Sequence, residues 1–316
     1  MRAMILAAGF GTRLWPLTVD RTKPSVPFLN KPLISHSVEY LHRFGVDEIV
    51  INLHHQGDSI RQALGSGEAF GVKIYYSQEE EILGTSGGLD HARNYFQDAT
   101  FVVMNGKVIT DLDLSAALKH HKERRALATL ILKENLNYEK FSTVLLNEDG
   151  NIRGFGAYPE NRSSSLPLMF TGIQVMEPEI FNYIPRNCFS HSTTDVYPKA
   201  IAEGKVIAAY TGTGVWQEFS TLARYLNISL EYLHQQGQNR ILGKDSSIAE
   251  GALVSNSILW DRVRVQTGAF LQRVVVGDDV SIPAGTKLEN AVVVRRDKCK
   301  EIEKGEVVGE NLVVKI

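Results

Sequence analysis

The sequence predicts an α/β domain with a doubly wound sheet, followed by a short left-handed parallel β-helix, and three observations support this prediction. Between Met1 and about Gln97, short apolar runs alternate with amphipathic stretches. Two more apolar runs follow, at 100–106 and 128–134. From Ile248 onward, apolar residues recur with a period that fits neither a helix nor a simple strand. The chain, with 316 residues, is long enough for both parts.

The order of elements in the first part indicates a parallel arrangement. Buried strands are expected at 3–9, 48–54, 72–78, 100–106 and 128–134, and helices at 33–45, 58–67, 89–95, 115–125 and 221–236. Strands that alternate with helices form a sheet covered on both faces. Ligands of such a sheet bind beyond the carboxyl ends of the strands.

The last part of the chain has a repeat of about six residues. Apolar side chains recur in steps of six or occasionally five, at Ile248, Val254, Leu259, Val265, Leu271, Val276, Ile282, Leu288 and Val294. Glycines that mark corners are interleaved, at Gly251, Gly268, Gly277 and Gly285. This period is typical of a β-helix built from hexapeptide coils, although an ordinary small β-domain is the alternative. We expect domains at 1–235 and 236–316. Whether the chain forms a homo-oligomer through the β-helix stays open.

Composition excludes several classes of protein. Hydrophobic residues make up 43% and charged residues 22% of the chain, as in ordinary globular proteins. A net charge of −2 gives no footprint for nucleic acid or an anionic membrane. Cys188 and Cys299 lack metal-ligand spacing, and no apolar run reaches the roughly 18 residues of a membrane span. We therefore expect a cytoplasmic protein without a disulfide.

A glycine-rich loop directly follows the first strand. Gly9 and Gly11 allow backbone N–H groups to turn inward around anionic phosphate oxygens. Arg13 and Lys23 can add positive charge to the same pocket. A dinucleotide fingerprint would need a third glycine where Leu14 lies, and a Walker loop would need Gly-Lys-Ser/Thr. The two glycines alone therefore fit either a structural turn or a phosphate site of another kind.

The longer string "LAAGFGTRLWPLTVDRTKP" resembles the signature of the nucleoside-diphosphate-sugar pyrophosphorylases, or sugar-phosphate nucleotidyltransferases. That signature reads G-x-G-T-R-L-x-P-x-T and then K-P, and the matching residues are Gly9, Gly11, Thr12, Arg13, Leu14, Pro16, Thr18, Lys23 and Pro24. The stretch "VPFLNKPLISHSVEYL" is similar to the mannose-1-phosphate guanylyltransferase branch, and "GTSGGL" to the nucleotide-base loop of the family. The resemblance covers nearly the whole chain and implies a Rossmann-like mixed sheet.

The resemblance implies a reaction and roles for individual residues. A sugar-1-phosphate oxygen attacks the α-phosphorus of a nucleoside triphosphate and pyrophosphate leaves, with GTP and mannose-1-phosphate as the favoured substrates. Arg13 would stabilise charge at the α-phosphate and the leaving group, and Lys23 would bridge the phosphates of both substrates. The nucleotide would lie against Leu6, Ala7, Ala8, Gly9, Gly11 and Thr12, its base and ribose near Gln78, Gly84 and Thr85, and the sugar phosphate near Asn105, Lys107 and Gly172.

Three motifs depart from the family pattern. The family reads N-G-D where this chain has Asn105-Gly106-Lys107, and that aspartate binds the catalytic Mg²⁺. A second metal aspartate is replaced by Glu218, which could still bind a hard cation. Ala157 and Tyr158 stand where the family often has a glutamate that holds the sugar and a lysine that holds the sugar phosphate. The Mg²⁺ cofactor that the resemblance implies is therefore in question.

Three accounts of Lys107 stay open. In the first, the enzyme is active, and Lys107, paired with Glu218, neutralises the triphosphate in place of the metal. In the second, Asp111 or Asp113 binds a displaced Mg²⁺. In the third, catalysis is lost and the protein is a regulatory paralogue that binds nucleotide sugars. The intact Arg13 and Lys23 favour an active, although slower, nucleotidyltransferase.

Overall fold

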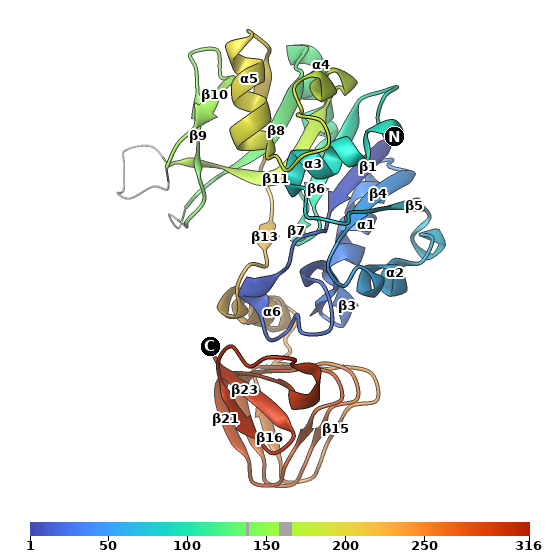
Figure 1. Cartoon of the computed structure of the whole chain (residues 1–316). Helices are drawn as coiled ribbons and strands as arrows, with labels where there is room; N and C mark the ends of the chain where they lie inside the picture. The colour runs from blue at the N-terminus through green and yellow to red at the C-terminus, as the bar shows by residue number, and fades with distance from the viewer. Residues whose placement is uncertain (137–138, 158–165) are drawn as a thin grey trace. The chain divides into compact units, whose positions relative to one another are not determined.

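The structure of the chain is a computed structural model that describes residues 1–136, 139–157 and 166–316 (Figure 1). These residues divide into two compact units, which we call unit 1 and unit 2. Unit 1 consists of Met1–Gly9, His36–Gly57 and Leu64–Trp216, and unit 2 of Phe10–Ser35, Asp58–Ala63 and Gln217–Ile316. Most of the glycine-rich loop therefore belongs to the same unit as the C-terminal strands. The domain boundary near residue 235 stays a prediction.

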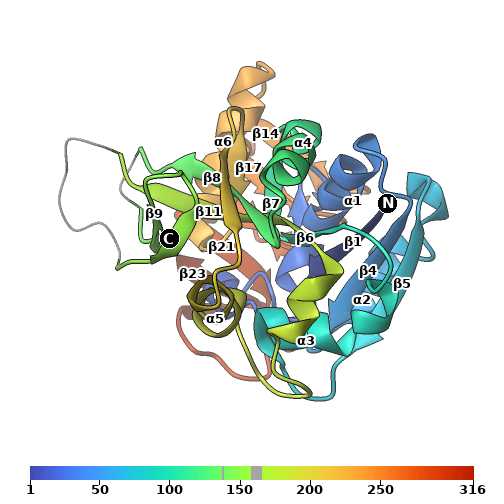
Figure 2. The ribbon, with the colours of Figure 1, turned by 90° about the horizontal axis from the view of Figure 1, so that it is seen from above.

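Four parallel strands form one side of the sheet in unit 1. They are β1 (Arg2–Leu6), β4 (Glu48–Leu53), β5 (Lys73–Gln78) and β6 (Phe101–Asn105). β1 pairs in parallel with β4 and β6, and β4 pairs with β5 (Figure 2). Ala3 to Ile5 of β1 and Ile49 to Leu53 of β4 are buried, because layers cover both faces of the sheet. The predictions of these strands are confirmed.

The rest of this sheet contains both antiparallel and parallel pairs, so the sheet is mixed as predicted. β11 (Leu168–Met176) lies antiparallel to β6 and to β8 (Ala128–Glu134), and β12 (Ile207–Thr211) lies parallel to β8. β9 (Thr143–Leu146) and β10 (Ile152–Phe155) form a hairpin at the edge. The register of β11 shifts between Phe170 and Gln174. The sequence did not predict β9 to β12.

The helices are α1 (Leu33–Arg43), α2 (Asp58–Leu64), α3 (Gly84–His91), α4 (Leu114–Arg124), α5 (Tyr197–Ala202) and α6 (Leu222–Gln235). The four N-terminal ones and α6 lie where the sequence predicts helices, although α3 begins five residues before the predicted start. Within unit 1, Leu89 of α3, Phe101 of β6 and Tyr197 of α5 share one core cluster with residues of β8 and β11. Packing in this core holds in place the edge of the sheet at which β1 and β6 end.

His121 lies in the last turn of α4, where an exposed, solvated side chain would be the simple expectation for a charged helix end. Its side chain is buried at the C-terminal end of α4, where Nδ1 lies 2.8 Å from Oγ1 of Thr129 and Nε2 lies 3.0 Å from Oε1 of Glu177. Burial lowers the pKa of His121, and the hydrogen bond to Glu177 only partly opposes this shift.

We therefore expect the free energy of unfolding to fall as the pH drops from 7 to 5. The unfolded chain binds a proton near the ordinary pKa of about 6.5, whereas the folded chain binds it at lower pH. Below pH 6.5 the unfolded state holds more protons than the folded state. The free energy of unfolding therefore falls by up to about 1.4 kcal/mol for each pH unit until His121 of the folded chain also titrates. Chemical denaturation of the natural chain and His121→Gln at several pH values measures this. A variant with the full natural pH dependence would contradict it, and the exposed His234→Gln is the control.

The C-terminal strands of unit 2 form a parallel β-helix. The parallel strands are β14 (Arg240–Leu242), β15 (Ser247–Ile248), β16 (Leu253–Ser255), β17 (Ser257–Leu259), β18 (Arg264–Val265), β19 (Phe270–Val276), β20 (Ser281–Ile282) and β21 (Lys287–Arg295). Leu253 pairs with Phe270 and Phe270 with Lys287, so each coil has seventeen residues. Two steps of six and one of five give this length, in agreement with the sequence. β22 (Glu306–Val308) and the antiparallel β23 (Asn311–Lys315) close the sheet.

Each coil turns at three corners where the backbone has a positive φ. The corners form three columns that repeat every seventeen residues: Asp245, Arg262 and Asp279; Gly251, Gly268 and Gly285; and Asn256, Arg273 and Asn290. Side chains of adjacent coils join along two columns, since Nε of Arg262 lies 2.5 Å from Oδ1 of Asp279 and Nε of Arg273 donates to Asn290. Gly277, which the sequence also places at a corner, has no positive φ and instead follows β19.

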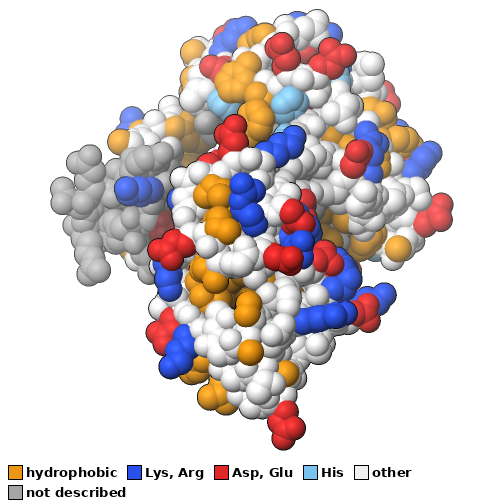
Figure 3. Space-filling model, turned by 60° about the horizontal axis from the view of Figure 1, so that its bottom comes forward, with side chains coloured by type: hydrophobic (Ala, Val, Ile, Leu, Met, Phe, Trp, Pro, Cys, Tyr) orange, Lys and Arg blue, Asp and Glu red, His pale blue; other side chains and the backbone are white. Residues whose placement is uncertain are grey.

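The surface agrees with the composition. Lysine and arginine side chains are interspersed with aspartate and glutamate over the described part of the face in Figure 3. Cys188 and Cys299 are free. In the part of the chain that the structure describes, no helix has both the length and the apolar character that crossing a membrane requires.

Candidate functional site

The glycine-rich loop of unit 2 exposes Arg13 on a short turn with a buried base. Gly11, with a φ of 72°, precedes the single turn Thr12–Leu14. Thr12 and Arg13 are exposed, whereas Leu14 and Leu17 are 0% and 1% exposed. Apolar burial therefore anchors the turn and leaves the guanidinium at the surface.

Lys23 lies on a second turn, Lys23–Ser25, in contact with the first. A Cβ atom added to Gly11 would lie 3.2 Å from Cβ of Lys23 and 3.3 Å from Cγ2 of Thr18. The Lys23 residue is 8% exposed. The structure thus brings Gly11, before the turn of Arg13, and the turn of Lys23 together within unit 2. That the two cations serve one phosphate pocket stays a prediction.

The end of β1, in unit 1, is already hydrogen-bonded within the protein. The N–H of Ala7 donates to Oδ1 of Asn52 at 2.8 Å, and the carbonyl of Leu6 accepts the N–H of Gly106 at 3.0 Å. Ala7 and Ala8 are buried, whereas Gly9 is exposed. Among the predicted nucleotide-lining residues, Gly9 and Thr12 are therefore exposed, whereas Leu6 and Gly11 are half-buried.

Asn52 and Glu79 form a buried support that the sequence analysis missed. Nδ2 of Asn52 donates to Oε1 of Glu79 at 2.7 Å, and the N–H of Leu83 donates to Oε2 at 3.1 Å. Burial raises the pKa of Glu79, although these two hydrogen bonds oppose the shift. A Cβ at Gly88 would lie 2.6 Å from Oε1 of Glu79. The signal for this support in the sequence is Asn52, a polar residue inside the otherwise apolar run of β4.

Gln78 lines an open pocket of about 350 Å³ in unit 1. Its lining residues come from the end of β5, from α3 and from two loops, namely Gln78, Glu79, Glu80, Glu81, Leu83, Gly87, His91 and Asn187. Gln78, Glu80 and Glu81 are exposed. The pocket therefore presents carboxylates next to a residue predicted to lie near the base.

Gly84 and Thr85 begin α3 and pack closely on a loop of unit 1. Gly84 has a φ of 75°, and a Cβ there would lie 2.5 Å from the carbonyl oxygen of Ser190. Oγ1 of Thr85 accepts the N–H of Ser192 at 3.1 Å and lies 3.3 Å from Nδ1 of His191. Both residues thus position the start of α3, and the hydroxyl of Thr85 already has protein partners.

Asn105 and Gly172, predicted on the sugar-phosphate side, lie against each other. A Cβ at Gly172 would be 2.1 Å from Nδ2 of Asn105, and Gly172 has a φ of 80°. The register shift of β11 lies at this glycine, and Nε1 of Trp216 donates to the carbonyl of Thr171 at 2.9 Å. Lys107 follows β6 and is half-buried. The structure therefore brings Asn105 and Gly172 together at the carboxyl end of β6.

The residues present do not fit the Mg²⁺ site that the resemblance implies. An ammonium has no lone pair for a metal, so Lys107 cannot replace the aspartate. Asp111 accepts the N–H of Val215 at 2.6 Å, and Asp113 caps α4 by accepting the N–H of Ala116 at 3.1 Å. Glu218, in unit 2, is 3% exposed. Within residues 1–136, 139–157 and 166–316, no three His, Cys, Asp or Glu side chains form a metal-binding group.

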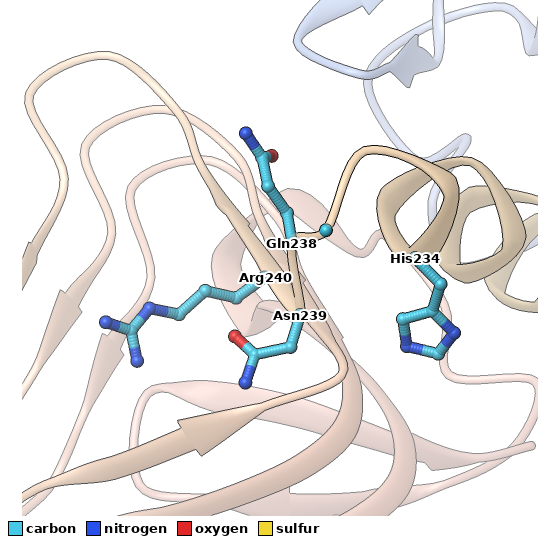
Figure 4. A pocket seen from close by; sticks show the side chains of 5 residues that line it. His234, Gln238, Asn239 and Arg240 are labelled. Carbon is cyan, nitrogen blue, oxygen red and sulfur yellow. The ribbon is translucent and has the colours of Figure 1, made fainter.

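A polar hollow of about 670 Å³ lies where α6 meets the first coil and is lined by His234, Gly237, Gln238, Asn239 and Arg240 (Figure 4). None of these residues belongs to the predicted site. Ala157 is exposed, and Tyr158 lies outside the described residues.

A mixed sheet with a glycine-rich loop after its first strand, followed by a hexapeptide β-helix, is the architecture of the sugar-phosphate nucleotidyltransferases. The chain belongs to the nucleotidyl transferase family, whose model matches residues 2–235, and a model of the GlmU-like C-terminal hexapeptide matches residues 232–314. It is a sugar-1-phosphate nucleotidyltransferase by family, similar to mannose-1-phosphate guanylyltransferases.

Individual proteins support this assignment. The chain is 31% identical to a UTP–glucose-1-phosphate uridylyltransferase of Synechocystis, over 86% of this chain and 74% of that protein. It is 29% identical to mannose-1-phosphate guanylyltransferase 1 of Arabidopsis thaliana, over 86% and 83%. The crystal structure of HddC from Yersinia pseudotuberculosis complexed with GMP-PN has a TM-score of 0.62 at 21% identity and covers 73% of this chain and 99% of that one. That structure supports the fold alone.

Proposed function

We propose that the protein transfers a guanylyl group from GTP to mannose-1-phosphate. The contact between the turns of Arg13 and Lys23 is the observation that supports transfer most directly, because it brings two cations to one loop. An Arabidopsis relative named mannose-1-phosphate guanylyltransferase supports the choice of substrates, although a uridylyltransferase is similarly close.

The pocket beside Gln78 supports GTP over UTP. The Watson–Crick edge of guanine carries two neighbouring donors, N1–H and the N2 amino group, whereas uracil carries a single N–H. Ionised Glu80 and Glu81 accept hydrogen bonds and cannot donate them. We propose that these carboxylates prefer guanine.

In the proposed reaction, a phosphate oxygen of the sugar phosphate attacks the α-phosphorus in line. A new P–O bond forms while the bond from the α-phosphorus to the bridging oxygen breaks, and pyrophosphate carries away the electron pair. Arg13 neutralises charge at the α-phosphate and the leaving group, and Lys23 holds the phosphates of both substrates. The protein contributes positioning and charge neutralisation, as in other phosphoryl transfers.

We further propose that Lys107 neutralises the triphosphate in place of a metal. Asp111 and Asp113, the alternative metal ligands, already accept backbone N–H groups. A lysine can serve as a point charge on phosphate, but it carries half the charge of Mg²⁺ and cannot clamp two oxygens. The transfer should therefore be slower than with a metal. Pairing of Lys107 with Glu218 stays a prediction.

Pyrophosphate release tests these proposals. We expect turnover with GTP and mannose-1-phosphate in the presence of a chelator, and weaker turnover with UTP and glucose-1-phosphate. Lys107→Met, which keeps most of the side-chain length and removes the charge, should lower kcat by about 10²-fold, the loss typical of one electrostatic donor. Lys119→Met, at an exposed position on α4, is the matched control.

A different outcome would favour the regulatory alternative, which Lys107 itself suggests. If the natural chain is inert and Lys107→Asp with Mg²⁺ restores transfer, the ammonium proposal is wrong. Tight binding of a nucleotide sugar by the inert natural chain, measured by calorimetry, would then indicate a non-catalytic sensor. Faster turnover with UTP than with GTP would contradict guanine selection.

A further inference from the structure

Arg21, two residues before Lys23, is held by the β-helix. Its Nη2 lies 2.5 Å from Oδ2 of Asp278, and its Cζ lies 4.9 Å from the ring centroid of Trp260. Its Nε lies 2.9 Å from Oδ1 of Asp20. The side chains of Arg21 and Asp278 are only 17% and 12% exposed. All of these residues belong to unit 2, so this is a contact inside one compact unit.

The β-helix fixes the partner of Arg21 in place. Oδ1 of Asp278 accepts the N–H of Asp261, on the preceding coil, at 2.9 Å. One oxygen of the carboxylate is therefore bound to the coil while the other binds the arginine. Nζ of Lys298 lies 2.9 Å from Oδ2 of Asp20 and adds a second connection. Burial alone would raise the pKa of Asp20, but Arg21 and Lys298 hold it below its usual value.

The same tryptophan holds the other end of the Lys23 segment. Nε1 of Trp260 donates to the hydroxyl of Tyr225 on α6 at 3.1 Å, and that hydroxyl donates to the carbonyl of Pro27 at 2.5 Å. Trp260 and Tyr225 are buried. The turn Lys23–Ser25 is thus connected to Trp260 on both sides, through Arg21 before it and Pro27 after it.

A contribution to stability does not by itself explain this arrangement. Apolar residues can replace a buried ion pair with little loss of stability, so such a pair is weak support for a purely stabilising role. An arginine that binds a carboxylate and stacks on an aromatic ring fixes a position and an orientation. A displacement of about 1 Å can cost about 10²-fold in rate at a site that acts by positioning.

We propose that Arg21 is a positioning residue for nucleotidyl transfer, held by Asp278 and Trp260 of the β-helix so that the Lys23 turn keeps the geometry that phosphate binding requires. The inference rests on the proposed function for its catalytic part. The β-helix then belongs to the transfer machinery and is more than an appended domain.

Arg21→Gln, Asp278→Asn and the double variant test the proposal in the full-length chain. We expect each single variant to lower kcat for pyrophosphate release by about 10- to 100-fold, with the KM for GTP changed less than about 3-fold. The double variant should lose little more than either single variant, because both break the same contact. Arg21→Lys should recover part of kcat. Arg262→Gln, which breaks an exposed ion pair of the β-helix, is the matched control and should keep kcat.

Hydrogen exchange provides a readout that does not depend on activity. The N–H groups of Ser25 and Val26, which donate to Thr22 and Lys23, should exchange faster in Arg21→Gln, while those of β1 and β4 should keep their protection. A lowered melting temperature with unchanged kcat and unchanged exchange at these two residues would reduce Arg21 to a structural role and overturn the proposal. Additive losses in the double variant would also contradict it.

The two proposals can fail separately. If the natural chain releases no pyrophosphate with any substrate pair, the proposed function is wrong, and exchange at Ser25 and Val26 still decides whether Arg21 positions the turn. If the natural chain is active and Arg21→Gln matches it in both kcat and exchange, only the positioning inference is wrong.

Discussion

Arg13→Ala is expected to lower kcat/KM for nucleotidyl transfer by about 10²- to 10³-fold, the loss typical when one preorganised donor to developing negative charge is removed. Arg13 is exposed on a turn that Leu14 and Leu17 anchor, so truncation should leave the fold intact. Pyrophosphate release at varied GTP concentration measures the loss, and a thermal melt checks folding.

Arg264→Ala is the control for this prediction, since Arg264 is exposed on β18 of the β-helix and outside the predicted site. Its kcat/KM should stay within about twofold of the natural value, because surface substitutions have small effects. An unchanged kcat/KM in Arg13→Ala would contradict the role of this guanidinium, and an equal loss in both variants would indicate nonspecific damage.

Gly172→Ala is expected to lower the free energy of unfolding by about 2–5 kcal/mol. The backbone at φ 80° costs an L side chain about 1–2 kcal/mol, and the overlap of the new methyl group with Nδ2 of Asn105 at 2.1 Å adds about 1–3 kcal/mol more. Denaturant unfolding monitored by circular dichroism gives the value. Displacement of Asn105 should also weaken binding of the sugar phosphate.

Gly150→Ala separates these two contributions. Gly150 has a φ of 75°, but a Cβ there would have no heavy atom within 4 Å, so only the backbone cost of about 1–2 kcal/mol remains. The difference between the two variants then measures the contact with Asn105. Equal losses would show that Asn105 simply moves aside, and the close packing of β11 on β6 would not explain the glycine.

Local pattern was enough to predict the parallel half of the sheet. The apolar runs of β1, β4 and β6 are continuous because both faces of these strands are buried. The steps of six and five residues predicted the seventeen-residue coil for a related reason. Each coil has three sides, and on each side one apolar side chain must point into the interior of the β-helix. The motif around Arg13 and Lys23 identified the loop whose two turns the structure brings together.

Features that depend on distant parts of the chain could not be predicted in this way. The middle strand β11 is interrupted at Gly172, and the reason for that glycine lies on Asn105, in another strand. Asn52 and Glu79 support the end of β1 through contacts across three strands. Arg21 and Asp278 are 257 positions apart, and no local rule connects them. Corners at Arg262 and Arg273 adopt a conformation that their residue type does not favour.

The seventeen-residue coil makes the C-terminal part modular in length. Because all three corner columns repeat with this spacing, a whole coil could be inserted or removed while every remaining corner keeps its residue. Deletion of a single residue would instead shift the sequence by one position. Residues suited to the interior of a strand would then occupy each later corner. Evolution can therefore change the length of the β-helix only by whole coils. Relatives that differ in length in this part should differ by a whole number of coils.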